Sequence, residues 1–127
     1  MTTPLSSGSY RDLIVWQRAM ELVAETHRAC RLLQSGDRWI LRDQLLRAAI
    51  SIPANVAEGR GRLSKADNVR HLLIARGSVR ELETLLLIGE RLGFLSADDM
   101  APALGLSDQV GRMLTALVRK LGTRQVR

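Results

Sequence analysis

The sequence has little cysteine, few aromatic residues and no long apolar run. Its single cysteine, Cys30, cannot form a disulfide within the chain, and one thiol is typical of a protein in a reducing compartment. Glu or Arg interrupts every apolar run well before it reaches the length of a membrane span. The first residues, "MTTPLSSGS", lack the basic and apolar regions of a signal peptide. We therefore expect a cytoplasmic protein with no membrane partner.

Aromatic residues make up only 3% of the chain, and two of the four fall among the expected core positions. The four are Tyr10, Trp16, Trp39 and Phe94. Binding of nucleic acid by base stacking is therefore not expected. Any such binding should depend on the phosphate backbone and show little sequence preference.

The composition is that of one globular domain with an excess of basic residues. The 127 residues are 46% hydrophobic and 25% charged, and Lys plus Arg number 19 against 13 for Asp plus Glu. The segment 38–80 holds nine basic and three acidic residues, so its net charge of +6 equals that of the whole chain. This concentration favours a polyanionic partner, although a solvated face is the usual role of such a charge run.

Four segments have the three-and-four spacing of apolar residues that is typical of amphipathic helices. The first begins near Asp12 and stops at "QSGD", 34–37, and the second begins near Asp37. Ser64 and Ser96 each start a capping box, and the third and fourth helices should end at Gly93 and Gly122. The expected apolar rows are Leu13, Trp16, Met20, Val23, His27 and Cys30, beside Val15, Ala19, Leu22, Thr26 and Ala29; then Leu41, Leu45, Ala48, Ile52 and Val56; Val69, Leu72, Val79, Leu82 and Leu86; and Met100, Ala103, Val110, Leu114, Leu117 and Leu121.

No segment alternates as a half-buried strand would, so the expected fold is all-α. We predict an antiparallel four-helix bundle with a proline-kinked second helix, because Pro53 cannot donate to the carbonyl of Ala49. Residues 1–10 should form a flexible N-terminal arm, residues 11–122 the bundle and residues 123–127 a basic C-terminal tail.

The stretch "SIPANVAEGRGRLS", 51–64, combines that proline with polar residues and two glycines. Four polar residues on the second helix and two in "ARGSVRELE", 75–83, predict a structural polar seam between the second and third helices: Arg47, Ser51, Asn55, Glu58, Arg76 and Glu81. Gly59 reads as a left-handed residue just past the end of the second helix. Gly77 in mid-helix indicates close passage of another helix.

The "GRGR" of the same stretch also suggests contact with phosphate. It lacks the preceding strand and the GKS or GKT ending of nucleotide-binding loops, so it does not predict a nucleotide site. Cations on a glycine turn before a helix are nevertheless well placed to contact a phosphate backbone. The candidate nucleic-acid-binding residues are Arg60, Arg62, Lys65 and Arg70.

Catalytic and metal-binding patterns are not found in the sequence. The Glu-x-x-His pairs of di-iron bundles are missing, and His27 with Cys30 would give a zinc ion only two ligands. There is no GxSxG motif and no evident base beside a nucleophile. We expect no enzymatic activity, no catalytic residues, no bound metal, no cofactor and no small-molecule substrate.

Three segments in combination carry a resemblance to a known family: "DLIVWQRAMELV", "QLLRAAISIPANVAEGRGR" and "IARGSVRELETLLLIGERLGFL". Between about Tyr10 and Leu95 the chain resembles the bacterial four-helix-bundle family named for reading frames in intervening sequences of 23S rRNA genes. The family includes the accessory variability determinant of diversity-generating retroelements. The resemblance implies a four-helix protomer, a ring-shaped pentamer and no established enzymatic activity. Its retroelement members are basic and work with a reverse transcriptase and nucleic acid, but nothing in this chain indicates that element.

Two functions remain open at this stage. One is a basic homo-oligomer that binds RNA or DNA, and the other is a protein–protein scaffold or adaptor whose positive charge serves solubility. Association is expected in both, because the consecutive apolar residues of "LLLIG", 85–89, point in every direction from a helix and one core cannot bury them all. A pentamer is the number that the family resemblance implies.

Overall fold

The structure, a computed structural model, describes residues 9–126, with side chains for residues 9–122. Most of the predicted arm at 1–10 and the side chains of the predicted tail at 123–127 lie outside these described residues. A short 3-10 helix, η1 (Tyr10–Asp12), precedes four α-helices. These are α1 (Ile14–Cys30), α2 (Arg38–Arg60), α3 (Lys65–Arg91) and α4 (Ala97–Val126). The described part of the chain contains no strand, so the predicted all-α class is confirmed.

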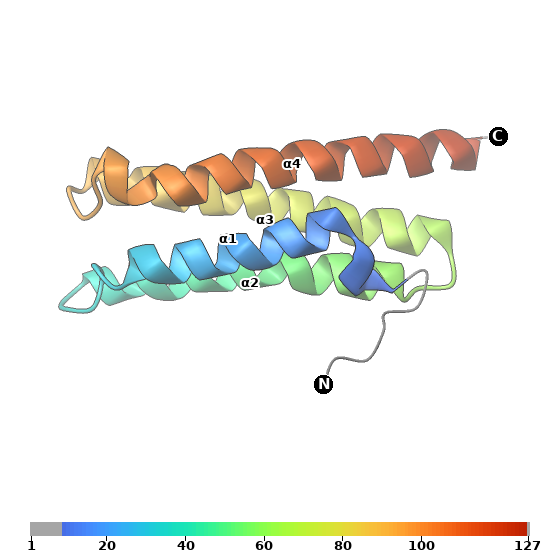
Figure 1. Cartoon of the computed structure of the whole chain (residues 1–127). Coiled ribbons are helices and arrows are strands. Elements are labelled where there is room, and N and C mark those ends of the chain that lie inside the picture. The colour runs from blue at the N-terminus through green and yellow to red at the C-terminus, as the bar shows by residue number, and fades with distance from the viewer. Residues whose placement is uncertain (1–8, 127) are drawn as a thin grey trace.

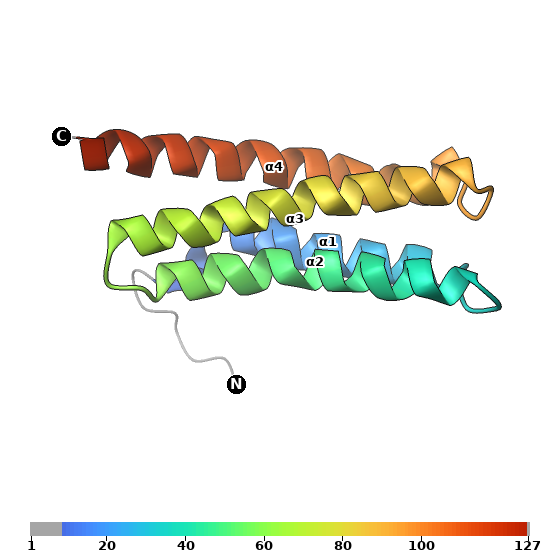
Figure 2. The ribbon, with the colours of Figure 1, turned by 180° about the vertical axis from the view of Figure 1, so that it is seen from behind.

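The four helices form a bundle in which each packs against two others. Helix α2 contacts α1 and α3, and α4 contacts α3 and α1. Figure 1 shows successive helices running in opposite directions, as the short connections require. Seen from behind, α2 and α3 lie side by side and are joined at the end where α4 finishes (Figure 2). The α2–α3 turn, η1 and the last turns of α4 therefore share one end of the bundle.

The core confirms the predicted apolar row of α2 but corrects that of α1. All five predicted α2 residues are buried. In α1 the second row is buried throughout, including Ala19 and Leu22, and Cys30 of the first row is buried as well, whereas Met20 is 45% exposed and His27 is exposed. Both rows of α1 have helical spacing and together form a wide apolar arc. Which part of this arc is buried depends on where α2 and α4 pack against α1.

The helix termini agree with part of the predicted capping. Ser96 and Asp99 form a reciprocal box at the start of α4: the Ser96 N–H donates to Asp99 at 2.8 Å, and the Asp99 N–H donates to the Ser96 hydroxyl at 3.1 Å. The first of these bonds holds the pKa of Asp99 below its ordinary value. At the start of α3 the Asp67 N–H donates to the Ser64 hydroxyl at 3.0 Å. Helix α4 does not end at Gly122 as predicted but continues to Val126.

The glycines of α2 and α3 have other roles than predicted. Gly59 lies inside α2 without a positive φ, and a Cβ there would stand 2.8 Å from the Cβ of His71 and 3.1 Å from the Asn68 carbonyl oxygen. Its function is thus close approach of α3, not helix termination. Gly77 is the reverse case, because a Cβ there meets nothing within 4 Å. Pro53 is buried within a continuous α2, and the kink stays a prediction.

Candidate nucleic-acid interface

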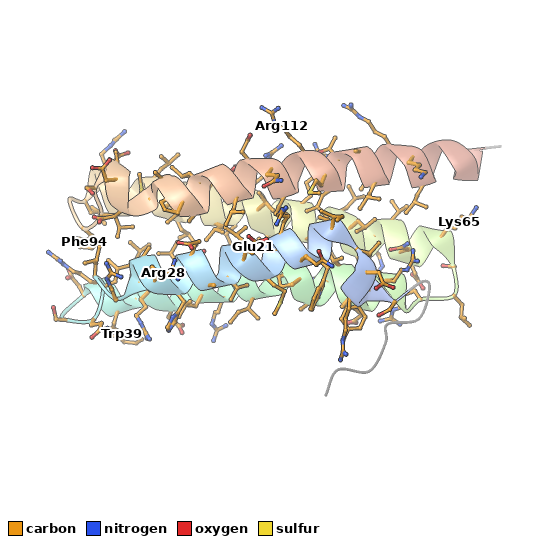
Figure 3. The ribbon with its side chains drawn as sticks, viewed as in Figure 1. Glu21, Arg28, Trp39, Lys65, Phe94 and Arg112 are labelled. Carbon is orange, nitrogen blue, oxygen red and sulfur yellow. The ribbon has the colours of Figure 1, made fainter. Side chains whose placement is uncertain are left out.

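The four predicted phosphate-binding cations gather at the α2–α3 turn. Arg60 ends α2, Arg62 lies in the turn, Lys65 begins α3 and Arg70 follows in its second turn; all four are exposed. The turn is short because the Gly61 N–H donates to carbonyls of the last turn of α2 and Ser64 caps α3. Figure 3 shows Lys65 at the tip of the bundle, at the opposite end from Trp39 and Phe94. We call these four residues the basic turn.

Carboxylates neutralise part of the charge of the basic turn. Arg62 pairs with Glu58 at 2.9 Å, and Arg70 lies 3.7 Å from Asp67. These pairs join residues three or four apart on one segment and are solvent-exposed, so each contributes little to stability. Lys65 has no ion pair among the described residues. Arg62, Lys65 and Arg70 are thus three cations beside two carboxylates, and a phosphate can replace either carboxylate as partner at small cost.

The bundle adds a further cation that sequence reasoning missed. Lys120 of α4 and Arg60 of α2 both line a cavity of about 260 Å³ at this end, together with Asn68 of α3. Its remaining walls are apolar side chains of α2, α3 and α4 and that of Leu13, which precedes α1. The only signal in the sequence was the basic character of the last turns of α4, and their position beside the α2–α3 turn depends on the direction in which α4 packs.

The polar seam between α2 and α3 exists, but it consists of hydrogen bonds and not of ion pairs. The Ser51 and Ser78 hydroxyls lie 2.9 Å apart, and the Asn55 amide donates to the Ser51 carbonyl at 2.9 Å. The side-chain oxygen Oδ1 of Asn55 accepts from Nδ1 of His71 at 3.0 Å, and His71 is buried. These bonds satisfy polar groups at the helix contact. Sequence reasoning did not include Ser78 or His71 in the seam, although Ser78 lies within the quoted "ARGSVRELE".

The charged members of the predicted seam do not bridge the two helices by ion pairs. Arg47 pairs with Asp43 of its own helix at 3.3 Å, and Glu58 pairs with Arg62. Arg47 and Glu81 both line a shallow pocket of about 290 Å³ over the Ser51–Ser78 contact, whereas Arg76 is half-buried on α3. Long charged side chains gain more from solvent and from neighbours on the same helix than from a bridge across the contact.

Cys30 and His27 do not form a site. Cys30 is buried, with Sγ 4.0 Å from the Arg42 carbonyl oxygen, and burial raises the pKa of its thiol to about 11 despite the opposing effect of the Arg42 charge. His27 is exposed. Within residues 9–122 no group of three or more His, Cys, Asp or Glu side chains is placed to hold a metal ion. Among the described helices, none is both long and apolar enough to cross a membrane.

The chain matches one family model and is similar in fold to a solved structure. A family model described as 23S rRNA-intervening sequence protein matches residues 11–116. A crystal structure of a protein of unknown function from the S23 ribosomal protein family of Bacteroides thetaiotaomicron superposes with a TM-score of 0.77 at 22% identity, covering 83% of this chain and 98% of that one. No curated protein matches the chain. The structural match supports the four-helix fold.

Proposed function

Because the chain belongs to the 23S rRNA-intervening sequence protein family, we propose that it is a non-enzymatic, cytoplasmic homo-oligomer whose basic surface binds the backbone of RNA or DNA without sequence specificity. The observation that carries this proposal is the basic turn, where four exposed cations meet at one tip of the bundle. The oligomer is a pentamer, as the resemblance to the family implies.

Binding at the basic turn works by charge neutralisation. Guanidinium groups donate two parallel hydrogen bonds to phosphate oxygens, and each neutralised phosphate releases a condensed counterion. Trp39 is the aromatic side chain most exposed among the described residues, and it lies at the opposite end of the bundle from Lys65 (Figure 3). Base stacking on Trp39 therefore cannot accompany phosphate contact at the basic turn within one protomer.

Exposed apolar side chains on α3 support the oligomer. Leu87 is 51% exposed and Ile88 is 41% exposed, although Leu86, the residue directly before them, is fully buried. Leu73 and Ile74 are also exposed, about four turns earlier on the same helix. A second copy would remove this surface from water, at about 25 cal/mol for each Å² buried.

Light scattering at micromolar concentration tests the oligomer, with a pentamer as the expected result. A monomer would contradict it. The double variant Leu87→Ser and Ile88→Ser should dissociate the assembly while leaving helix content unchanged by circular dichroism, because neither side chain lies in the protomer core.

A ring of protomers would present several basic turns to one polyanion, so weak single contacts would combine through multivalency. Gel-shift titrations against a structured RNA and a DNA duplex at several salt concentrations test the proposal. The expected result is binding at low salt that weakens as salt rises and differs little between unrelated sequences. No binding even at low salt would leave the alternative, a protein–protein scaffold whose charge serves solubility.

A further inference from the structure

A second basic surface lies in the groove between α3 and α4, apart from the basic turn. Arg80 of α3 and Arg112, Thr115 and Arg119 of α4 line a pocket of about 320 Å³ there. Figure 3 shows Arg112 projecting from α4 away from the bundle. We call these four residues and Gly111 beneath them the arginine groove.

The shape of the arginine groove depends on Gly111. A Cβ at this buried position would lie 3.5 Å from Cγ1 of Val79 and 3.8 Å from Nη1 of Arg80, so the Arg80 guanidinium lies over the α4 backbone. One turn before it, the Ser107 hydroxyl donates to the Glu83 carboxylate at 3.1 Å and ties the two helices together. The Arg80 side chain of α3 therefore lines the same pocket as Arg112 and Arg119 of α4.

The charges of the groove leave it positive. Three arginines line it against one carboxylate, that of Asp108. Arg112 pairs with Asp108 at 3.1 Å, and Arg80 lies 3.7 Å from Glu83, but the arginine side chains are 80% and 60% exposed. Such exposed pairs are weak, so a phosphate oxygen can displace them. Arg119 has no ion pair among the described residues.

The lining also indicates which partner the groove suits. The guanidinium groups and the Thr115 hydroxyl offer donors, and no large apolar side chain lines the pocket. An aromatic or aliphatic anchor from a protein would find no cavity to fill, whereas guanidinium forks match phosphate oxygens. Arg112 and Arg119 are two turns apart, about 10 Å along the helix axis, so they reach different phosphates of one strand.

We propose that the arginine groove binds the phosphodiester backbone of a nucleic acid, as a second contact surface on the α3–α4 side of each protomer. This inference rests on the proposed function and adds to it a site outside the basic turn. A strand held at both surfaces would follow the α3 side of the bundle rather than touch only its tip.

Fluorescence anisotropy with a labelled single-stranded RNA, measured with the full chain over a salt series, tests the groove. In the variant Arg80→Gln, Arg112→Gln and Arg119→Gln, affinity at low salt should fall at least tenfold. The slope of log affinity against log salt should become shallower by about 2, since each single-strand phosphate contact contributes about 0.7. The matched control, Arg18→Gln, Arg28→Gln and Arg31→Gln, removes the same charge from α1 and the residue after it and should change the slope by less than 1.

Equal losses of affinity in the two triple variants would contradict binding at the arginine groove, because the loss of three positive charges anywhere on the protein would then explain both results. The proposed function would not be contradicted by that outcome. Absence of binding by the unmodified protein at low salt would overturn the proposed function and the groove together. Circular dichroism and light scattering check that each variant keeps its fold and assembly. The single variant Arg119→Gln disturbs no ion pair of the described structure and should by itself reduce the slope by about 0.7; an unchanged slope contradicts the assignment.

Discussion

Replacing Gly59 by alanine tests the closest approach of α2 and α3. The new Cβ would stand 2.8 Å from the His71 Cβ, 2.9 Å from Oδ1 of Asn68 and 3.1 Å from the Asn68 carbonyl oxygen. The Asn68 amide can rotate away, but the Asn68 carbonyl and the His71 Cβ move only with the α3 backbone. Overpacking of this kind costs about 1–3 kcal/mol, and the better helix propensity of alanine returns about 1 kcal/mol. We expect a net loss of unfolding free energy of about 1 kcal/mol.

Gly77→Ala is the matched control, because a Cβ there meets nothing within 4 Å. It should raise the unfolding free energy by about 0.5–1 kcal/mol through helix propensity alone. Urea denaturation at a fixed protein concentration measures both values, with unchanged m-values showing that the denatured state is the same. If Gly59→Ala stabilises the protein as much as Gly77→Ala does, the close contact described between α2 and α3 is wrong.

Three further perturbations have defined outcomes. Glu58→Ala should cost less than about 0.5 kcal/mol in urea denaturation, because its partner Arg62 is exposed; a loss above 1 kcal/mol would mean that the pair has a buried role. Asn55→Ala removes the acceptor of the buried His71 Nδ1–H and should cost about 1–3 kcal/mol, and a neutral result would contradict that hydrogen bond. Burial raises the pKa of Cys30 above its ordinary value, so its stabilising contribution is complete below pH 9 and is lost as pH rises towards 11. The stability difference between the unmodified protein and Cys30→Ala should shrink over that window, and a constant difference would refute the shift.

The sequence determined the helices more securely than their faces. The α2 row was predicted correctly, since Leu41, Leu45 and Ile52 are all buried, although the apolar side chains of Ile40 and Ile50 on the same helix are exposed. In α1 two adjacent stripes have the same periodicity, and the exposure of Met20 follows only from where the other helices pack. Gly59 was misread for a similar reason, since a glycine near a helix end has the same local signature whether it terminates the helix or admits a neighbour.

In the candidate site, too, positions close in the sequence could be predicted, whereas contacts between distant segments could not. The positions of Arg60 and Lys65 at one turn follow from the chain itself, because few residues separate the two helices. The placement of Lys120 near Arg60, and of Arg80 over Gly111, joins residues distant in the sequence and needs the packed bundle. The ion pairs were the least predictable feature, because an exposed charged side chain can pair with several neighbours at nearly equal free energy.

The salt dependence of nucleic-acid binding tests the central claim most directly. The claim is that the basic turn meets a phosphate backbone, so the logarithm of affinity should fall linearly with the logarithm of salt concentration. Replacing Arg60, Arg62 and Lys65 together by serine should flatten that slope by about 2, weaken binding to unrelated sequences equally and leave the oligomer intact. The account is contradicted if the protein binds neither RNA nor DNA at low salt, or if the triple-serine variant keeps the affinity and slope of the unmodified protein.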